Sequence, residues 1–78
     1  MAEEVGPPPL EALHKQYPIL KFFRYDHLPD KLQVISRPFS YLAYDMARDL
    51  PGGAEVSAGL RKLLEAKDCL VRAALEPK

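Results

Sequence analysis

The triplet Pro51-Gly52-Gly53 separates two long amphipathic segments in the second half of this 78-residue chain. Proline and glycine stop helices, so the triplet predicts a tight turn between two of them. The first helix is predicted over about residues 31–50 and the second over about residues 54–75. Because a short link joins helices of similar length, the sequence predicts an antiparallel helical hairpin over about residues 30–75.

Each predicted helix carries apolar residues at three- and four-residue steps, the spacing of a single helix face. In the first helix these residues are Leu32, Ile35, Phe39, Leu42, Ala43 and Met46. In the second they are Val56, Leu60, Leu63, Leu64, Leu70, Val71 and Ala74. Lys67 interrupts the second face, where a lysine usually extends to water or meets an acid. In a ligand-binding oligomer, Lys67 could instead point into a pocket between chains.

Two local features are expected in the first helix. Pro38 removes the hydrogen bond to the Val34 carbonyl, and because the apolar pattern keeps its phase on both sides, we expect a kink rather than a break. Asp30 has the character of an N-cap residue, and Gln33 stands where it can complete a capping box.

The front of the chain is broken up by prolines. Residues 1–9 end in Gly-Pro-Pro-Pro and are expected to form a mobile arm, and residues 10–78 a single domain. A short helix is predicted over residues 10–17, ending before Pro18. Residues 19–25 are apolar and aromatic, with no second convincing strand to pair with. We expect them to form an extended strap laid over the helices.

A chain this short buries only about 60% of its unfolded surface, so an isolated monomer would be marginally stable. The single cysteine, Cys69, cannot form an intramolecular disulfide, and neither histidine has zinc-ligand spacing. Self-association is therefore the expected source of additional stability, and the predicted fold class is an all-α homo-oligomer.

Charge and hydropathy restrict the partners. Eleven basic residues balance eleven acidic ones, which disfavours a broad contact with duplex DNA. No apolar run approaches the roughly 20 residues that span a bilayer, and the first residues do not resemble a signal peptide. We therefore expect a cytoplasmic protein with neither DNA nor a membrane as its partner.

Catalytic and metal-binding patterns are weak. His27 lies beside Asp26, but no serine stands in a nucleophile motif, so an enzyme is not expected. Asp45 and Asp49 are one helical turn apart, yet a third carboxylate is missing nearby and a solvated helix face is the preferred interpretation. No cofactor or metal is predicted.

One cluster combines aromatic rings with positive charge: Lys21, Arg24, Tyr25 and His27. Residues 21–37 hold four basic against two acidic groups, and four of the seven aromatic residues fall within residues 17–25. Rings interleaved with cations suit stacking on a planar base and holding a phosphate. The alternative, equally open from composition, is a strap with its rings in the core and its cations at the surface.

A longer series of spaced residues carries a resemblance to a known family. The series comprises Phe23-Arg24-Tyr25-Asp26-His27-Leu28-Pro29, Leu32-Gln33, Ser36, Pro38-Phe39, Leu42-Ala43, Leu50-Pro51, Glu55, Leu60, Leu63-Leu64-Glu65-Ala66-Lys67-Asp68 and Val71-Arg72-Ala73. It resembles the helical hairpin shared by bacteriophage anti-CBASS cyclic-nucleotide sponges and anti-Thoeris sponges. The likeness covers about residues 22–75, and the shorter anti-CBASS branch is the nearer one.

The resemblance implies a hexamer that sequesters signalling cyclic nucleotides without cleaving them. In the anti-CBASS branch an aromatic residue stacks on a base and a lysine holds phosphate; Tyr17 and Lys21 are the nearest equivalents here. Arg24, Tyr25 and His27 stand where that family places further pocket residues. The trinucleotide-binding branch has an arginine where this chain has Ala54. The resemblance therefore implies cyclic dinucleotides more directly than trinucleotides.

Two functions follow as hypotheses. The first is a phage sponge that binds cyclic di- or oligonucleotide immune messengers in the infected host and so blocks CBASS-type signalling. Its predicted ligand-binding residues are Tyr17, Lys21, Arg24, Tyr25, His27 and Lys67. The alternative is a small helical-hairpin oligomer that serves as a protein–protein interaction module and binds no nucleotide.

Overall fold

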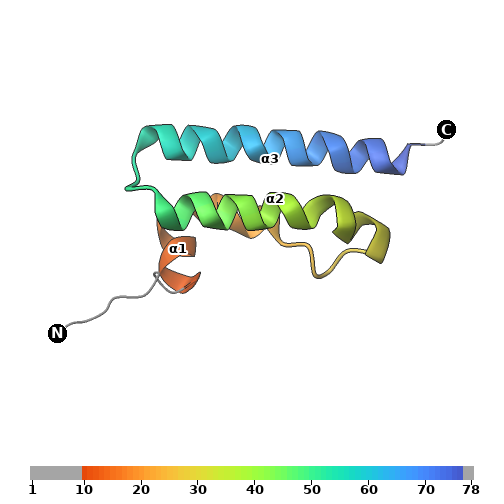
Figure 1. Cartoon of the computed structure of the whole chain (residues 1–78), viewed down its shortest axis with the longest axis horizontal. Helices are drawn as coiled ribbons and strands as arrows, with labels where there is room; N and C mark the ends of the chain where they lie inside the picture. The colour runs from red at the N-terminus through yellow and green to blue at the C-terminus, as the bar shows by residue number, and fades with distance from the viewer. Residues whose placement is uncertain (1–9, 77–78) are drawn as a thin grey trace.

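The computed structural model describes residues 10–76, and the arm predicted over residues 1–9 lies outside that range. The described chain contains a short helix α1 (Leu10–Gln16), a 3-10 helix η1 (Pro18–Phe23) and two long helices, α2 (Asp30–Asp49) and α3 (Ala54–Leu75). Helices α2 and α3 lie side by side as a hairpin, joined by a short turn (Figure 1). The predicted all-α class and the predicted hairpin are confirmed.

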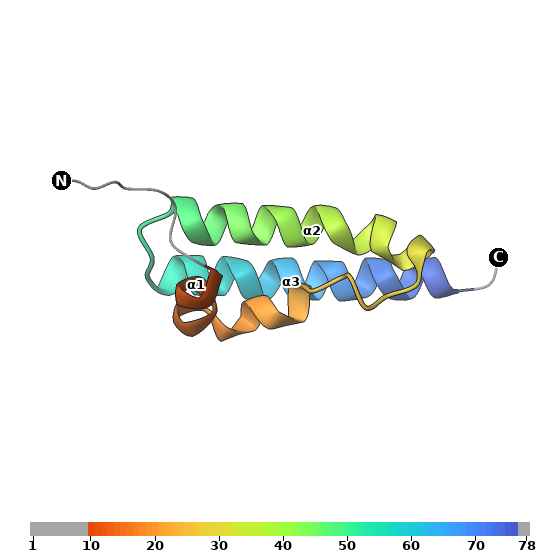
Figure 2. The same ribbon diagram turned by 90° about the horizontal axis from the view of Figure 1, so that it is seen from below.

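Helix η1 corrects the prediction of an extended strap over residues 19–25. Pro18 begins a 3-10 helix that runs to Phe23, and the chain becomes extended only at Arg24. Proline favours the first turn of a helix because its φ is already fixed and its missing N–H is not needed there. In Figure 2, η1 runs along the hairpin, and it contacts both long helices.

Two side chains of η1 form the centre of the core. Leu20 and Phe23 are three residues apart on η1 and both are fully buried. They belong to one cluster of buried apolar residues: Leu13, Tyr17, Leu20, Phe23, Ala43, Ala47 and Leu60. Since every element of the fold supplies at least one member, η1 holds α1 and the hairpin together.

The buried side of α2 differs from the predicted apolar face. Its buried residues are Leu32, Ser36, Ser40, Ala43 and Ala47, most of which are small. Small side chains allow η1 to approach α2 closely, so that Leu20 and Phe23 occupy the space between the helices. Leu42 and Met46, which belong to the predicted apolar face, are 46% and 38% exposed in the single chain, and Ile35 and Phe39 are half-buried.

Helix α3 is also partly uncovered. Leu60 is its only fully buried residue, whereas Val56, Leu63, Leu64 and Val71 are half-buried. Leu70 and Ala74, which belong to the predicted apolar face, are exposed in the single chain. The helix η1 therefore covers one side of the hairpin, and another side of the hairpin stays uncovered.

The start of α2 does not form the predicted capping box. Pro29 occupies the N-cap position, and no side chain caps the helix there. Gln33 instead donates its side-chain amide to the carbonyl oxygens of Leu28, at 2.8 Å, and Asp26, at 3.4 Å. The amide thus fixes the preceding segment onto α2. The helix continues through Pro38 without a break.

The turn between α2 and α3 depends on its two glycines. Gly52 and Gly53 have φ values of 103° and 113°, a conformation that favours glycine. A Cβ atom on Gly52 would lie 3.1 Å from the side-chain amide nitrogen of Gln16 and 3.3 Å from the Tyr17 hydroxyl. The turn is therefore packed against the end of α1, and the predicted helix stop is confirmed.

The neighbouring phenylalanines of η1 provide a direct test of this core. Phe23→Ala is expected to lower the free energy of unfolding by about 3–5 kcal/mol, because it leaves a cavity among fully buried side chains. Phe22→Ala is the matched control, since Phe22 is 56% exposed, and it should cost less than about 1 kcal/mol. Urea denaturation followed by circular dichroism measures both. Equal losses for the two variants would contradict the assigned core.

Candidate ligand-binding cleft

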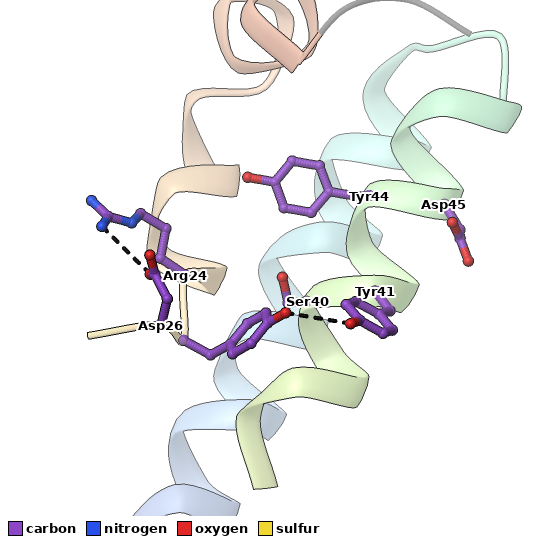
Figure 3. Close-up of a pocket in the computed structure, with 7 residues that line it drawn as sticks. Arg24, Asp26, Ser40, Tyr41, Tyr44 and Asp45 are labelled. Carbon is purple, nitrogen blue, oxygen red and sulfur yellow. Dashed lines mark hydrogen bonds and ion pairs between the residues drawn. The ribbon is translucent and has the colours of Figure 1, made fainter. Parts of the chain in front are cut away.

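A cleft of about 490 Å³ lies between α2 and the extended segment that follows η1 (Figure 3). Its lining residues are Arg24, Tyr25, Asp26, Ser40, Tyr41, Tyr44 and Asp45. The first three come from the segment between η1 and α2, and the other four come from α2. This volume is within the range typical of small-molecule sites, and the walls combine aromatic rings with charged groups.

Two tyrosines from opposite sides of the cleft contact each other. The rings of Tyr25 and Tyr41 meet edge to face, with centroids 6.1 Å apart and planes at 75°. The Tyr25 hydroxyl donates a hydrogen bond to the Tyr41 hydroxyl over 3.4 Å. The guanidinium carbon of Arg37 lies 5.7 Å from the centre of the Tyr25 ring. Tyr41 and Arg37 together hold the Tyr25 side chain in place, Tyr41 through an edge-to-face contact and Arg37 through its cation over the ring.

Tyr44 supplies a third ring and is held by α1. Its hydroxyl lies 2.6 Å from His14 Nε2, in a hydrogen bond that links residues 30 positions apart. The two ring centroids are 5.6 Å apart. Leu13 and Tyr17 anchor α1 in the core, so His14 has a fixed position from which to orient Tyr44.

The charged groups of the cleft are largely exposed. Arg24 lies 3.5 Å from Asp26 at its closest approach, a weak pair in which both side chains remain open to water. On α2, Arg48 contacts the carboxylates of Asp45 at 3.0 Å and Asp49 at 2.8 Å. Asp45 and Asp49 thus share one arginine as their partner. Within residues 10–76, no group of three or more potential metal ligands occurs.

The pKa values of two cleft tyrosines are raised above the ordinary value. For Tyr25 the main cause is the hydrogen bond to Tyr41, followed by partial burial, while Arg37 acts in the opposite direction. For Tyr44 the cause is burial, which Arg24 partly offsets. Both hydroxyls therefore remain protonated at neutral pH, and they keep their hydrogen bonds to Tyr41 and His14.

The structure places the predicted site residues in different surroundings. Arg24 and Tyr25 line the cleft. Lys21 is exposed on η1, with its ammonium 5.2 Å from the centre of the Phe22 ring. His27 is also exposed, with Nδ1 4.0 Å from the Asp26 carboxylate. Lys21 and His27 thus flank the segment that forms the cleft without lining the cleft itself.

Two other predicted residues take part in packing in the single chain. Tyr17 is only 4% exposed and belongs to the core, so its ring presents no open face for stacking. The Lys67 ammonium donates to the Phe22 carbonyl oxygen at 2.9 Å and pairs with Asp68 at 3.0 Å. The Lys67 side chain is 12% exposed, so the lysine on the apolar side of α3 fastens the end of η1.

Sequence reasoning missed the α2 side of the cleft. Tyr41 and Tyr44 are three residues apart and fall outside the apolar pattern of the first helix, so they were not considered. Ser40 lies beside them and is buried, and Asp45 completes this side. The pair of tyrosines on one face of the helix was a sequence signal for a binding surface. It identifies a site only once the fold shows that the segment bearing Tyr25 lies opposite them.

The cleft is chemically suited to a small planar ligand that carries negative charge. Aromatic rings provide surfaces and edges for a base, and Arg24 provides a cation. The Tyr41 hydroxyl accepts from Tyr25 and keeps its own proton to donate. Asp26 and Asp45 add acceptors at its rim.

Comparison of the chain with protein-family models, curated proteins and solved structures found no match in any of the three. No helix within the described residues is long and apolar enough to cross a membrane.

The raised tyrosine pKa values predict a loss of stability in alkali. Unfolded tyrosine releases its proton near pH 10, whereas Tyr25 and Tyr44 hold theirs to higher pH in the folded protein. The unfolded state therefore binds fewer protons above about pH 10, and the free energy of unfolding should fall as pH rises through that range. Absorbance titration of tyrosinate should show late-titrating groups that Tyr25→Phe and Tyr44→Phe each remove. An unchanged titration curve in both variants would contradict the assigned surroundings.

Proposed function

We propose that this protein binds cyclic di- or oligonucleotide immune messengers and sequesters them without cleaving them. In an infected bacterial host, such a sponge would withhold the activator of CBASS-type anti-phage signalling. The observation that carries the proposal is the cleft, which unites Arg24 and Tyr25 with Tyr41 and Tyr44. The resemblance of residues 22–75 to the anti-CBASS sponges, which includes Arg24 and Tyr25, is the second ground for the proposal.

The balance of charge is compatible with such a ligand. A cyclic dinucleotide carries two phosphates and needs only a few well-placed cations, unlike duplex DNA. Arg24 lines the cleft, and Lys21 and Arg37 lie on the adjoining parts of η1 and α2. Because the Arg24–Asp26 pair is weak and exposed, a phosphate can compete for this guanidinium at little cost.

The proposal includes assembly. A homo-oligomer, which the resemblance implies is a hexamer, would stabilise a chain that has a small core of its own. We propose that the protein acts in the cytoplasm, with cyclic nucleotide and other copies of itself as its partners.

One observation favours a second candidate function, a protein–protein interaction module. Several large apolar side chains of the hairpin are exposed, among them Leu42, Met46 and Leu70. Exposed apolar patches of this kind mark docking surfaces for other proteins. This function needs no nucleotide, so a ligand titration separates the two candidates.

Isothermal titration calorimetry with a panel of cyclic dinucleotides, cyclic trinucleotides and linear dinucleotides tests the sponge. Tight binding of a cyclic compound, with the compound recovered intact after denaturation of the protein, is the expected result. Heat of binding followed by recovery of a linear product would contradict sequestration. A folded protein that binds no member of the panel would favour the interaction module.

Single substitutions then test the site. Arg24→Ala should weaken binding of the cyclic ligand by about 10- to 100-fold, as loss of a charge-assisted phosphate contact does. Tyr25→Ala should weaken it by about 5- to 150-fold through loss of stacking. Arg61→Ala is the matched control, because Arg61 is exposed on α3 and does not line the cleft. Equal affinity in the Arg24 variant and this control would remove Arg24 from the site.

A further inference from the structure

The hairpin has an apolar side that no other described element covers. We call it the open face, and its most prominent residues are Val34, Leu42, Met46, Leu50, Leu63 and Leu70. Two adjoining grooves run along it, one of about 330 Å³ near the turn and one of about 560 Å³ toward the other end. Both are lined by α2 and α3 alone, whereas η1 occupies a different side of the hairpin (Figure 2).

Charge is confined to the ends of the open face. Glu55 is the only charged residue that lines the first groove, and Glu76 is the only one that lines the second. The stretch between them is apolar, with Gly59 and Ala73 leaving the backbone of α3 accessible. A surface of this kind can meet an identical surface without like charges facing each other at its centre.

The size of the open face also fits a second copy. The 22 residues of α3 span roughly 33 Å, and two adjacent helices are roughly 20 Å wide. The face therefore covers on the order of 600 Å² per chain, near the roughly 800 Å² per partner of a specific interface. Residues 1–9 are a poorer occupant, because Met1 and Val5 are their only large apolar residues.

We propose that the open face is the surface on which a second copy of this chain docks, in a two-fold contact of like with like. The contact buries Leu42 and Met46 of α2 against the same helices of the partner copy. This inference deepens the oligomer in the proposed function and locates its interface. The cleft and the two grooves have no lining residue in common, so the contact uses a surface separate from the cleft.

Sedimentation velocity of the full chain over a range of concentrations tests the inference. The wild-type protein should sediment as a dimer or larger species, and Leu42→Glu should raise the dissociation constant by about 100-fold or more, because it places an unpaired charge in the interface. Phe22→Glu is the control, since Phe22 is exposed but lies outside the open face. It should assemble like the wild type.

Further readouts keep the test decisive if Leu42→Glu fails to fold. The melting temperature of the wild-type protein should rise with protein concentration, as it does when folding is coupled to association. A wild-type protein that is monomeric at every concentration overturns the inference. In that case another occupant, such as residues 1–9 or a different protein, would have to cover the open face. Loss of assembly in Phe22→Glu but not in Leu42→Glu overturns it as well.

Calorimetry of the same samples shows separately whether the cyclic nucleotide binds. Failure of the sponge proposal can therefore be distinguished from failure of the proposed interface.

Discussion

The seating of Leu20 and Phe23 between the two long helices is the contact on which the rest of the structure depends. Both side chains are fully buried, and η1, which carries them, contacts α1, α2 and α3. Close approach of η1 requires small residues on α2, and Ser36, Ser40, Ala43 and Ala47 meet that need. The Ser36 hydroxyl is buried there without a hydrogen-bond partner, a cost that close packing must offset. Several larger apolar residues of α2, among them Val34, Leu42 and Met46, are exposed, and an open face results.

The same packing creates the cleft. Lys67 holds the end of η1 through the Phe22 carbonyl, and Gln33 holds the segment beyond it through the carbonyls of Asp26 and Leu28. Between these two anchors, Arg24 and Tyr25 lie opposite Tyr41 and Tyr44 of α2. Structural contacts thus present a cation and three rings around one space. In our account, one side of α2 lines the ligand cleft and another side contributes to the open face on which a second copy docks. Helices α3 and η1 pack against α2 between these two surfaces.

The sequence predicted the hairpin well, because Pro51, Gly52 and the apolar spacing are local signals. For Leu42 and Met46 it predicted only an apolar face, because helical periodicity does not show which neighbour covers that face. The strap was expected to be extended because its composition suggested a strand, whereas the position of Pro18 favoured a helical turn. Arg24 and Tyr25 could be predicted because aromatic and basic residues alternate in that part of the sequence. Tyr41 and Tyr44 could not be predicted, because the segment opposite them is distant in the chain and its position depends on tertiary packing.

The most direct test of the central claim is nuclear magnetic resonance of the four tyrosine rings, labelled isotopically, during titration with a cyclic dinucleotide. Three of them, Tyr25, Tyr41 and Tyr44, line the cleft, and Tyr17 is buried in the core. Our account predicts that the ring signals of the three cleft tyrosines move with added ligand while those of Tyr17 stay in place. Binding that moves Tyr17 alone, or that leaves all three cleft rings unchanged, would contradict it.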